Sequence, residues 1–146
     1  MIALADVAVV VSNAKRSARW WTKNLGFASH TIGGEGRHAV LVAPPGDKFV
    51  LHLCEGFAPL EPEDSGIAFV TDAMGALVAR MKRGKVRFPQ PPKQEPWGMV
   101  GKFADLDGNI FWLLGVPTKM VRQTLRMRAP VAKRGGSMPR ARPRRR

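Results

Sequence analysis

The sequence predicts an α+β fold of two tandem βαβββ modules, followed by a basic tail. Three observations predict it. A strand, a capped helix and three extended segments occur in that order twice, offset by about 60 residues. The 146 residues, 45% of them hydrophobic, suffice for one domain without disulfides. The excess positive charge lies beyond residue 116. We predict a domain over 1–116, with modules at about 4–54 and 66–115 and a linker at 55–65.

The first module begins with Val7–Val11, an unbroken apolar run typical of a buried strand. A helix follows, because Ser12 or Asn13 can cap it and Gly26 suits the left-handed turn after it. The apolar residues of this helix recur every three or four positions on one face: Ala14, Ala18, Trp21 and Leu25. An extended stretch then starts at Phe27.

Two more extended runs complete the first module. His38–Ala43 and Lys48–Cys54 are joined by Pro-Pro-Gly-Asp, a sequence that favours a reverse turn, so the two runs predict a hairpin. Residues 55–65 are acidic, contain proline and show no period, which predicts the linker.

The second module repeats this order. Gly66–Thr71 matches the first strand, Asp72 is predicted to cap the next helix, and Gly84 is predicted to end it. The apolar stripe of that helix consists of Met74, Leu77, Val78 and Met81. Three extended segments follow: Val86–Phe88, Met99–Ala104 and Ile110–Leu114. Asp107-Gly108-Asn109 supplies a tight turn before the last of them.

Two segments resemble the signatures of a known family. VAVVVSNAKRSARWWTKNLGF resembles the opening of the vicinal-oxygen-chelate superfamily, which includes glyoxalases, bleomycin-resistance proteins and extradiol dioxygenases. PWGMVGKFADLDGNIFWLLG resembles its closing segment, with Leu106 in place of the usual proline. The resemblance covers about residues 4–115 and implies an open, curled mixed sheet that forms a cup with the binding or active site inside it.

The resemblance also implies where a metal would be held. In metal-dependent members, the first and last strands of each module each project one ligand into the cup. These positions fall at Asp6, His52, Gly66 and Trp112 in this sequence. Gly66 and Trp112 offer no ligand, and two ligands from one module would leave a metal mostly to water. We therefore predict no metal or other cofactor.

The leading hypothesis is a metal-free small-molecule-binding protein that resembles the bleomycin-resistance type. The resemblance implies a homodimer with its ligand in the cup, and a role in antibiotic or metabolite sequestration. The candidate ligand contacts are His52, Trp97, Phe103 and Trp112. The aromatic face of Trp112 suits a flat or cationic ligand, whereas packing in the core is the alternative role for the three aromatic residues.

The second hypothesis is an enzyme of the same superfamily, a lyase, isomerase or dioxygenase. Asp6 and His52 would act in it as an acid and base pair, with or without a metal. The structural alternative is that His52 donates a hydrogen bond to Asp6 in a satisfied buried pair.

The charge of the chain is concentrated in its tail. From Pro117 onward there are eleven Lys and Arg and no acidic residue, whereas residues 1–116 hold thirteen Lys and Arg against eleven Asp and Glu, a net charge of 13 − 11 = +2. Residues 117–129 predict a short amphipathic helix, and the Arg- and Pro-rich residues 130–146 predict a disordered segment. The third hypothesis is weak, non-specific contact of this tail with nucleic acid or an anionic surface.

The chain contains no obvious membrane or export signal. No apolar run approaches the roughly 20 residues needed to cross a bilayer. The first residues lack the charged start and cleavage site of a signal peptide. We therefore expect a cytoplasmic protein.

Overall fold

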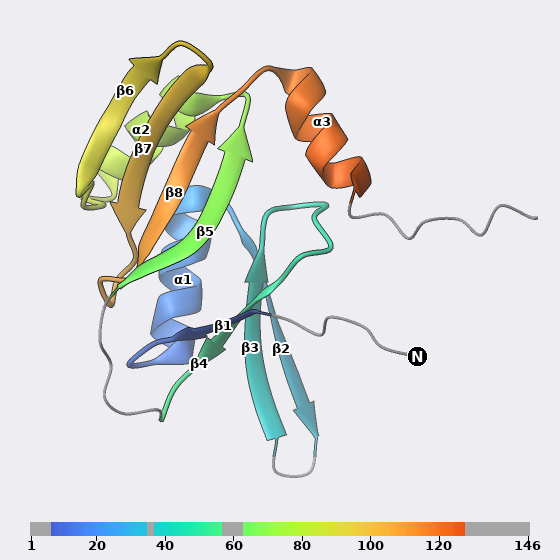
Figure 1. The fold of residues 1–146 in the computed structure, drawn as a ribbon. Coiled ribbons are helices and arrows are strands. Elements are labelled where there is room, and N and C mark those ends of the chain that lie inside the picture. The colour runs from blue at the N-terminus through green and yellow to red at the C-terminus, as the bar shows by residue number, and fades with distance from the viewer. Residues whose placement is uncertain (1–6, 35–36, 57–62, 128–146) are drawn as a thin grey trace, which may run out of the picture.

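The computed structural model describes residues 7–34, 37–56 and 63–127. One sheet contains β1 (Val7–Val10), β2 (Ala28–Gly34), β3 (Arg37–Ala43) and β4 (Leu51–Cys54), in the order β1-β4-β3-β2. The other contains β5 (Asp64–Thr71), β6 (Gln90–Glu95), β7 (Gly98–Ala104) and β8 (Ile110–Gly115), in the order β5-β8-β7-β6. The helices are α1 (Ala14–Leu25), α2 (Met74–Arg83) and α3 (Thr118–Met127). Figure 1 shows this arrangement.

The two sheets have the same topology, one in each module. The first strand of each module pairs in parallel with the last strand of that module. The remaining pairs are antiparallel. The predicted α+β fold of two tandem βαβββ modules with mixed sheets is confirmed.

The caps of α1 agree with the sequence, and so does the end of α2 at Gly84, but the N-cap of α2 does not. The side chain of Asn13 accepts a hydrogen bond from the Arg16 N–H at 2.8 Å, and Gly26 ends α1 with a left-handed φ of 75°. The prediction that Asp72 caps α2 is wrong, because Ala73 holds that position without a side-chain bond. The Asp72 carboxylate instead accepts a hydrogen bond from the Thr118 hydroxyl at 2.7 Å, which ties α3 to the start of α2.

The strand predicted at Val86–Phe88 is displaced along the chain. The structure places β6 at Gln90–Glu95, a segment that contains Pro91 and Pro92. Proline cannot donate to a strand ladder and is tolerated at the edge of a sheet, and β6 is the outer strand of its sheet. Val86 is buried beneath α2, and its N–H donates to the Met81 carbonyl, so its apolar character reflects core packing.

The core joins the two modules around Trp21, which is fully buried on α1. The centroid of its ring lies between 5.0 and 5.9 Å from the rings of Phe27, Phe69, Phe103 and Phe111. Three of these phenylalanines belong to the second module. Because aromatic pairs in such edge-to-face and offset arrangements add to the stability gained by burial, we infer that this cluster holds the modules together.

The turn from Asp105 to Asn109 forms a second link between the modules. Its Asn109 side chain donates to the Val10 carbonyl at 3.0 Å, and Asp107 accepts from the Ser12 N–H at 3.0 Å. The carboxylate of Asp105 is buried at the centre of the turn and accepts from the N–H groups of Asp107 and Asn109, both at 2.9 Å. The turn chemistry therefore also docks the second module on the end of β1.

Helix α3 lies within the segment that the sequence predicts to be amphipathic. Its approach is set by the Val116 N–H, which donates to the Thr71 carbonyl at 2.9 Å at the end of β5. The half-buried side chains of Val121 and Thr124 face the body of the protein, whereas Lys119 and Arg122 are exposed. The predicted disordered segment at 130–146 lies outside the described residues.

Candidate functional site

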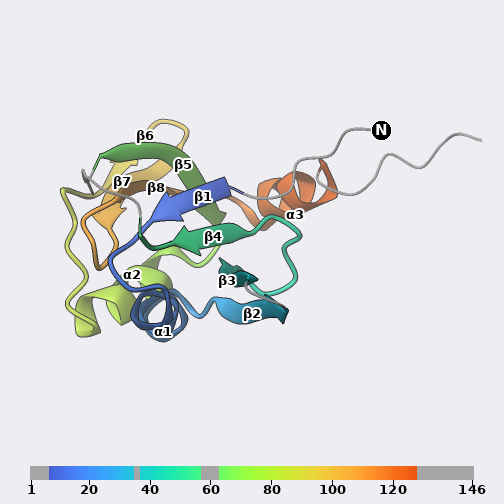
Figure 2. The ribbon, with the colours of Figure 1, turned by 90° about the horizontal axis from the view of Figure 1, so that it is seen from below.

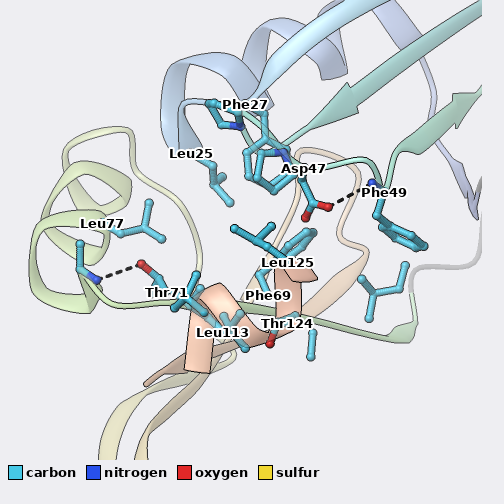
Figure 3. A pocket seen from close by; sticks show the side chains of 17 residues that line it. Leu25, Phe27, Asp47, Phe49, Phe69, Thr71, Leu77, Leu113, Thr124 and Leu125 are labelled. Carbon is cyan, nitrogen blue, oxygen red and sulfur yellow. Dashed lines mark hydrogen bonds between the residues drawn. The ribbon is translucent and has the colours of Figure 1, made fainter. Parts of the chain in front are cut away.

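An apolar pocket of about 330 Å³ lies where the two modules meet α3. We call it the seam pocket. One wall is the end of α1 with the Pro44–Phe49 turn of the first module, the second is Ile67–Thr71 of β5 with the start of α2, and the third is α3. Figure 3 shows Phe69, Leu77 and Leu125 around this space. A pocket of this size can hold a small organic molecule.

The polar groups on its walls bond to the backbone. The Asp47 carboxylate accepts from the Phe49 N–H at 3.1 Å. The Thr71 hydroxyl accepts from the Ala73 N–H at 3.1 Å, and the Thr124 hydroxyl donates to the Met120 carbonyl at 3.0 Å. Asp47 is the one ionisable residue on the described walls. The pocket therefore favours a ligand that is largely apolar.

The strand β5 gives the pocket a backbone edge. Because β5 is, like β6, an edge strand of its sheet and pairs with β8 on one side, its other edge is not used in the sheet. Ala68 and Val70 on this strand line the pocket together with Phe69, which belongs to the core side. An open edge can offer hydrogen bonds to a polar atom on an otherwise apolar ligand.

A second cluster lies on the face of the β5–β8 sheet opposite to the core. Lys102 and Trp112 are direct neighbours across β7 and β8, and the Lys102 ammonium lies 4.0 Å from the centroid of the Trp112 ring. The same ammonium lies 2.6 Å from the Asp64 carboxylate. This contact with Lys102, followed by the Gly66 N–H bond, lowers the pKa of Asp64 below its ordinary value of 3.8.

The residues that the sequence singles out are spread over the molecule. His52 is half-buried on β4 beside Ala8 and Leu41, and Asp6, its predicted partner, lies outside the described residues. Trp97 is 58% exposed in the turn between β6 and β7. Phe103 is fully buried against Trp21 in the core.

Neither Gly66 nor Trp112 provides a metal donor at the positions implied by the resemblance. Gly66 is exposed with a left-handed φ of 67°, and its N–H donates to Asp64. Within residues 7–34, 37–56 and 63–127, no three His, Cys, Asp or Glu side chains are grouped closely enough to hold a metal ion. In the same ranges, no helix combines the length and apolar character needed to cross a bilayer.

Comparison with known proteins settles the family. The model of the Glyoxalase/Bleomycin resistance protein/Dioxygenase superfamily matches residues 3–113. The chain belongs to this superfamily. The uncharacterized protein YetH of Bacillus subtilis (strain 168) is 30% identical over 115 residues, which cover 75% of this chain and 95% of YetH.

Two solved structures from Streptomyces sp. CB03234 share the fold of this superfamily member. TnmS3, an antibiotic binding protein, is 28% identical with a TM-score of 0.66, and the match covers 80% of this chain and 99% of TnmS3. A glyoxalase/bleomycin resistance protein is 30% identical with a TM-score of 0.62, and the match covers 75% of this chain and 99% of that protein.

Sequence reasoning missed the seam pocket and the partners of Trp112. The register from the Asp107-Gly108-Asn109 turn could have placed Lys102 beside Trp112, because residues paired across a hairpin share a face. The seam pocket has no such local signal, since its walls come from segments far apart in the chain.

Proposed function

We propose that this protein is a small-molecule-binding member of the superfamily that holds a largely apolar ligand in the seam pocket. The observation that carries the proposal is the pocket itself, whose described walls hold one ionisable residue, Asp47. The similarity to TnmS3, which is described as an antibiotic binding protein, supports a role in binding an antibiotic or a metabolite.

We place the ligand in the seam pocket and not in the cup that the sequence analysis favours. The sequence predicts a ligand in the cup, in contact with His52, Trp97, Phe103 and Trp112. One face of the Trp112 ring is covered by the Lys102 ammonium, which is held there by Asp64. A ligand could stack on that face only by displacing an ion pair, whereas the seam pocket is apolar and accessible.

We further propose that binding needs no metal. Two of the four positions that the superfamily uses for ligands are Gly66 and Trp112, which have no suitable donor atom. A divalent ion near Trp112 would also lie close to the ammonium of Lys102, and like charges repel. The donor set of the second module therefore does not fit a metal.

Titration with N-phenyl-1-naphthylamine tests the proposal. This neutral dye fluoresces in apolar sites and is not attracted by the basic tail. Val121→Phe should fill the pocket from α3 and weaken binding at least tenfold, whereas Ala79→Phe, at an exposed position of α2, should leave it unchanged. Binding should also survive dialysis against EDTA. Undiminished binding by Val121→Phe, or loss of binding in EDTA, would contradict the proposal.

We also infer that the protein is a cytoplasmic homodimer. Ile32 supports the association, because it is 53% exposed on β2 although it is a large apolar residue. Light scattering after size exclusion should give twice the chain mass, and Ile32→Lys should shift the protein toward the monomer. A wild-type monomer at micromolar concentration would exclude the dimer.

A further inference from the structure

Positive and negative side chains lie in different secondary-structure elements of this protein. Within the described residues, the three helices carry Lys or Arg and contain no Asp or Glu: α1 has four cations, α2 has three and α3 has three. The eight carboxylates of the domain that the structure describes lie in strands, turns and loops instead. The net charge of +2 for residues 1–116 therefore hides a strongly basic helical surface.

Three of these cations line one groove. Lys15, Arg19 and Lys23 follow each other at intervals of four residues, which places them on one side of α1. They border a shallow groove of about 440 Å³ between α1 and β2, and the opposite wall carries Ser29 and Thr31. We call it the α1–β2 groove. It combines a row of cations with hydroxyl groups that can donate hydrogen bonds.

The end of α2 adds charge at one end of this groove. The Arg80 guanidinium donates to the carbonyls of Lys23 and Thr22 at 2.9 and 3.0 Å, which fastens α2 to the last turn of α1. Figure 2 shows the two helices side by side. Lys82 and Arg83, at the end of α2, are exposed and extend the positive field beyond Lys23.

The carboxylates that the structure describes do not neutralise the cations of the groove. Among the described residues, no carboxylate forms an ion pair with Lys15, Arg19 or Lys23. Glu55 is near the start of α1, where its carboxylate accepts from the Ala14 N–H at 2.8 Å and caps the helix. All three cations are exposed, so the row is open to a partner.

We propose that the α1–β2 groove binds the phosphate backbone of double-stranded nucleic acid, without regard to base sequence. Lys15 and Lys23 are eight residues apart, or about 12 Å along the helix. Each strand of B-DNA carries one phosphate per about 3.4 Å of duplex axis, so a length of about 12 Å along the axis holds three to four phosphates of one strand. Ser29 and Thr31 would donate to phosphate oxygens. Because α1 is half embedded in the core, it contacts the backbone without entering a groove of the duplex.

The surface favours nucleic acid over a membrane. Helices that bind lipid surfaces present large apolar side chains beside their cations. The large exposed apolar residues of the described chain lie elsewhere, at Ile32, Trp97, Leu106, Met120 and Leu125. Apart from the buried Ala18 and Val40, the groove is lined by cations and hydroxyl groups, which suits phosphates on a stiff polyanion.

Fluorescence anisotropy of a labelled 20-base-pair DNA duplex, titrated with the full chain between 50 and 300 mM KCl, tests this proposal. The triple variant Lys15→Gln/Arg19→Gln/Lys23→Gln should bind about tenfold more weakly at 100 mM KCl. The slope of log affinity against log salt should fall by about 2 to 3, since each lost phosphate contact removes about 0.9. Wild-type affinity and slope in this variant would overturn the proposal.

Matched variants separate the groove from the tail and from general charge. Arg142→Gln/Arg144→Gln/Arg146→Gln removes the same charge from the tail and should weaken binding less than the groove variant. Lys15→Arg/Lys23→Arg keeps the charge and should bind within about twofold of the wild type. Thr31→Glu places a carboxylate on the opposite wall and should weaken binding without touching α1. A loss confined to the tail variant would assign binding to the tail.

Two further readouts complete the test. Vesicles with 30% phosphatidylserine should compete poorly with the duplex at equal phosphate concentration, and stronger binding to vesicles than to DNA would overturn the choice of partner. The groove variant should still bind N-phenyl-1-naphthylamine, because the seam pocket shares no residue with the groove. Dye binding therefore tests the proposed function in the seam pocket, and duplex binding tests the groove, so that either proposal can fail without the other.

Discussion

At the scale of single residues, the close packing of α1 against α2 depends on the lack of a side chain at Gly84. Gly84 follows α2, and a Cβ atom built there would lie 1.7 Å from the buried Asn24 side-chain oxygen. Gly75, near the start of the same helix, has nothing within 4 Å of such an atom. A side chain is therefore excluded at Gly84 but has room at Gly75. The sequence alone predicts only that the helix ends at Gly84.

Substitution of these glycines by alanine should have opposite effects on stability. Gly84→Ala should lower the free energy of unfolding by about 1–3 kcal/mol, as overpacking does. Gly75→Ala should raise it by up to about 1 kcal/mol, because alanine is the better helix former. Urea denaturation measures both. In an Asn24→Ala background the cost of Gly84→Ala should shrink, and an unchanged cost would show that the close approach is not its cause.

The Lys102 ammonium should control the ionisation of Asp64. The folded state holds the pKa of Asp64 below its ordinary value mainly through Lys102. Its stabilising contribution is therefore present above the unfolded pKa and is lost as pH falls through the folded pKa. Lys102→Met should raise the pKa of Asp64, as followed by NMR of its carboxyl carbon. The control variant Lys93→Met, which removes the partner of Glu95, should leave the pKa of Asp64 unchanged. If the pKa of Asp64 is the same in Lys102→Met as in the wild type, the ion pair is ruled out as its cause.

At the scale of elements, the turn from Asp105 to Asn109 links the modules through a buried carboxylate. Burial raises the pKa of Asp105 above 3.8, against the opposing effect of its hydrogen bonds with Asn109 and Asp107. Because its folded pKa is the higher one, the stability that it contributes is complete below 3.8 and is lost as pH rises through the folded pKa.

Replacement of Asp105 by asparagine should therefore change the pH dependence of stability. The stability of the wild type relative to Asp105→Asn should decline as pH rises from about 3.5 and then level off. Urea denaturation at a series of pH values measures the difference. A difference that grows with pH would mean that hydrogen bonding to the ionised form outweighs burial.

Most elements could be predicted from the sequence because their signals are local. The caps and the spacing of apolar residues predict α1, and the turn residues predict the β7–β8 hairpin. Prediction failed where the signal was tertiary: Val86 is apolar because it packs under α2, while β6 tolerates Pro91 and Pro92 because it is an outer strand. Asp72 has a capping side chain, yet it binds Thr118 of α3.

At the scale of the whole molecule, the order of the two modules was predictable but the space between them was not. The seam pocket depends on how β5, the Pro44–Phe49 turn and α3 approach one another. The role of α3 as its third wall follows from the bonds of Val116 and Thr118 at the end of β5. The core contacts of Trp21 and the turn at Asp105 set the relative position of the modules, and thereby the shape of the pocket.

The central claim is that a ligand lies in the seam pocket and not on the open faces of the sheets. Intermolecular NOEs between N-phenyl-1-naphthylamine and methyl-labelled protein locate the bound dye directly. We predict NOEs to the methyl groups of Leu77, Val121 and Leu125, which line the pocket. NOEs to Leu41 beside His52 and to Leu114 beyond Trp112, with none to the pocket residues, would place the ligand in the cup and contradict the proposal.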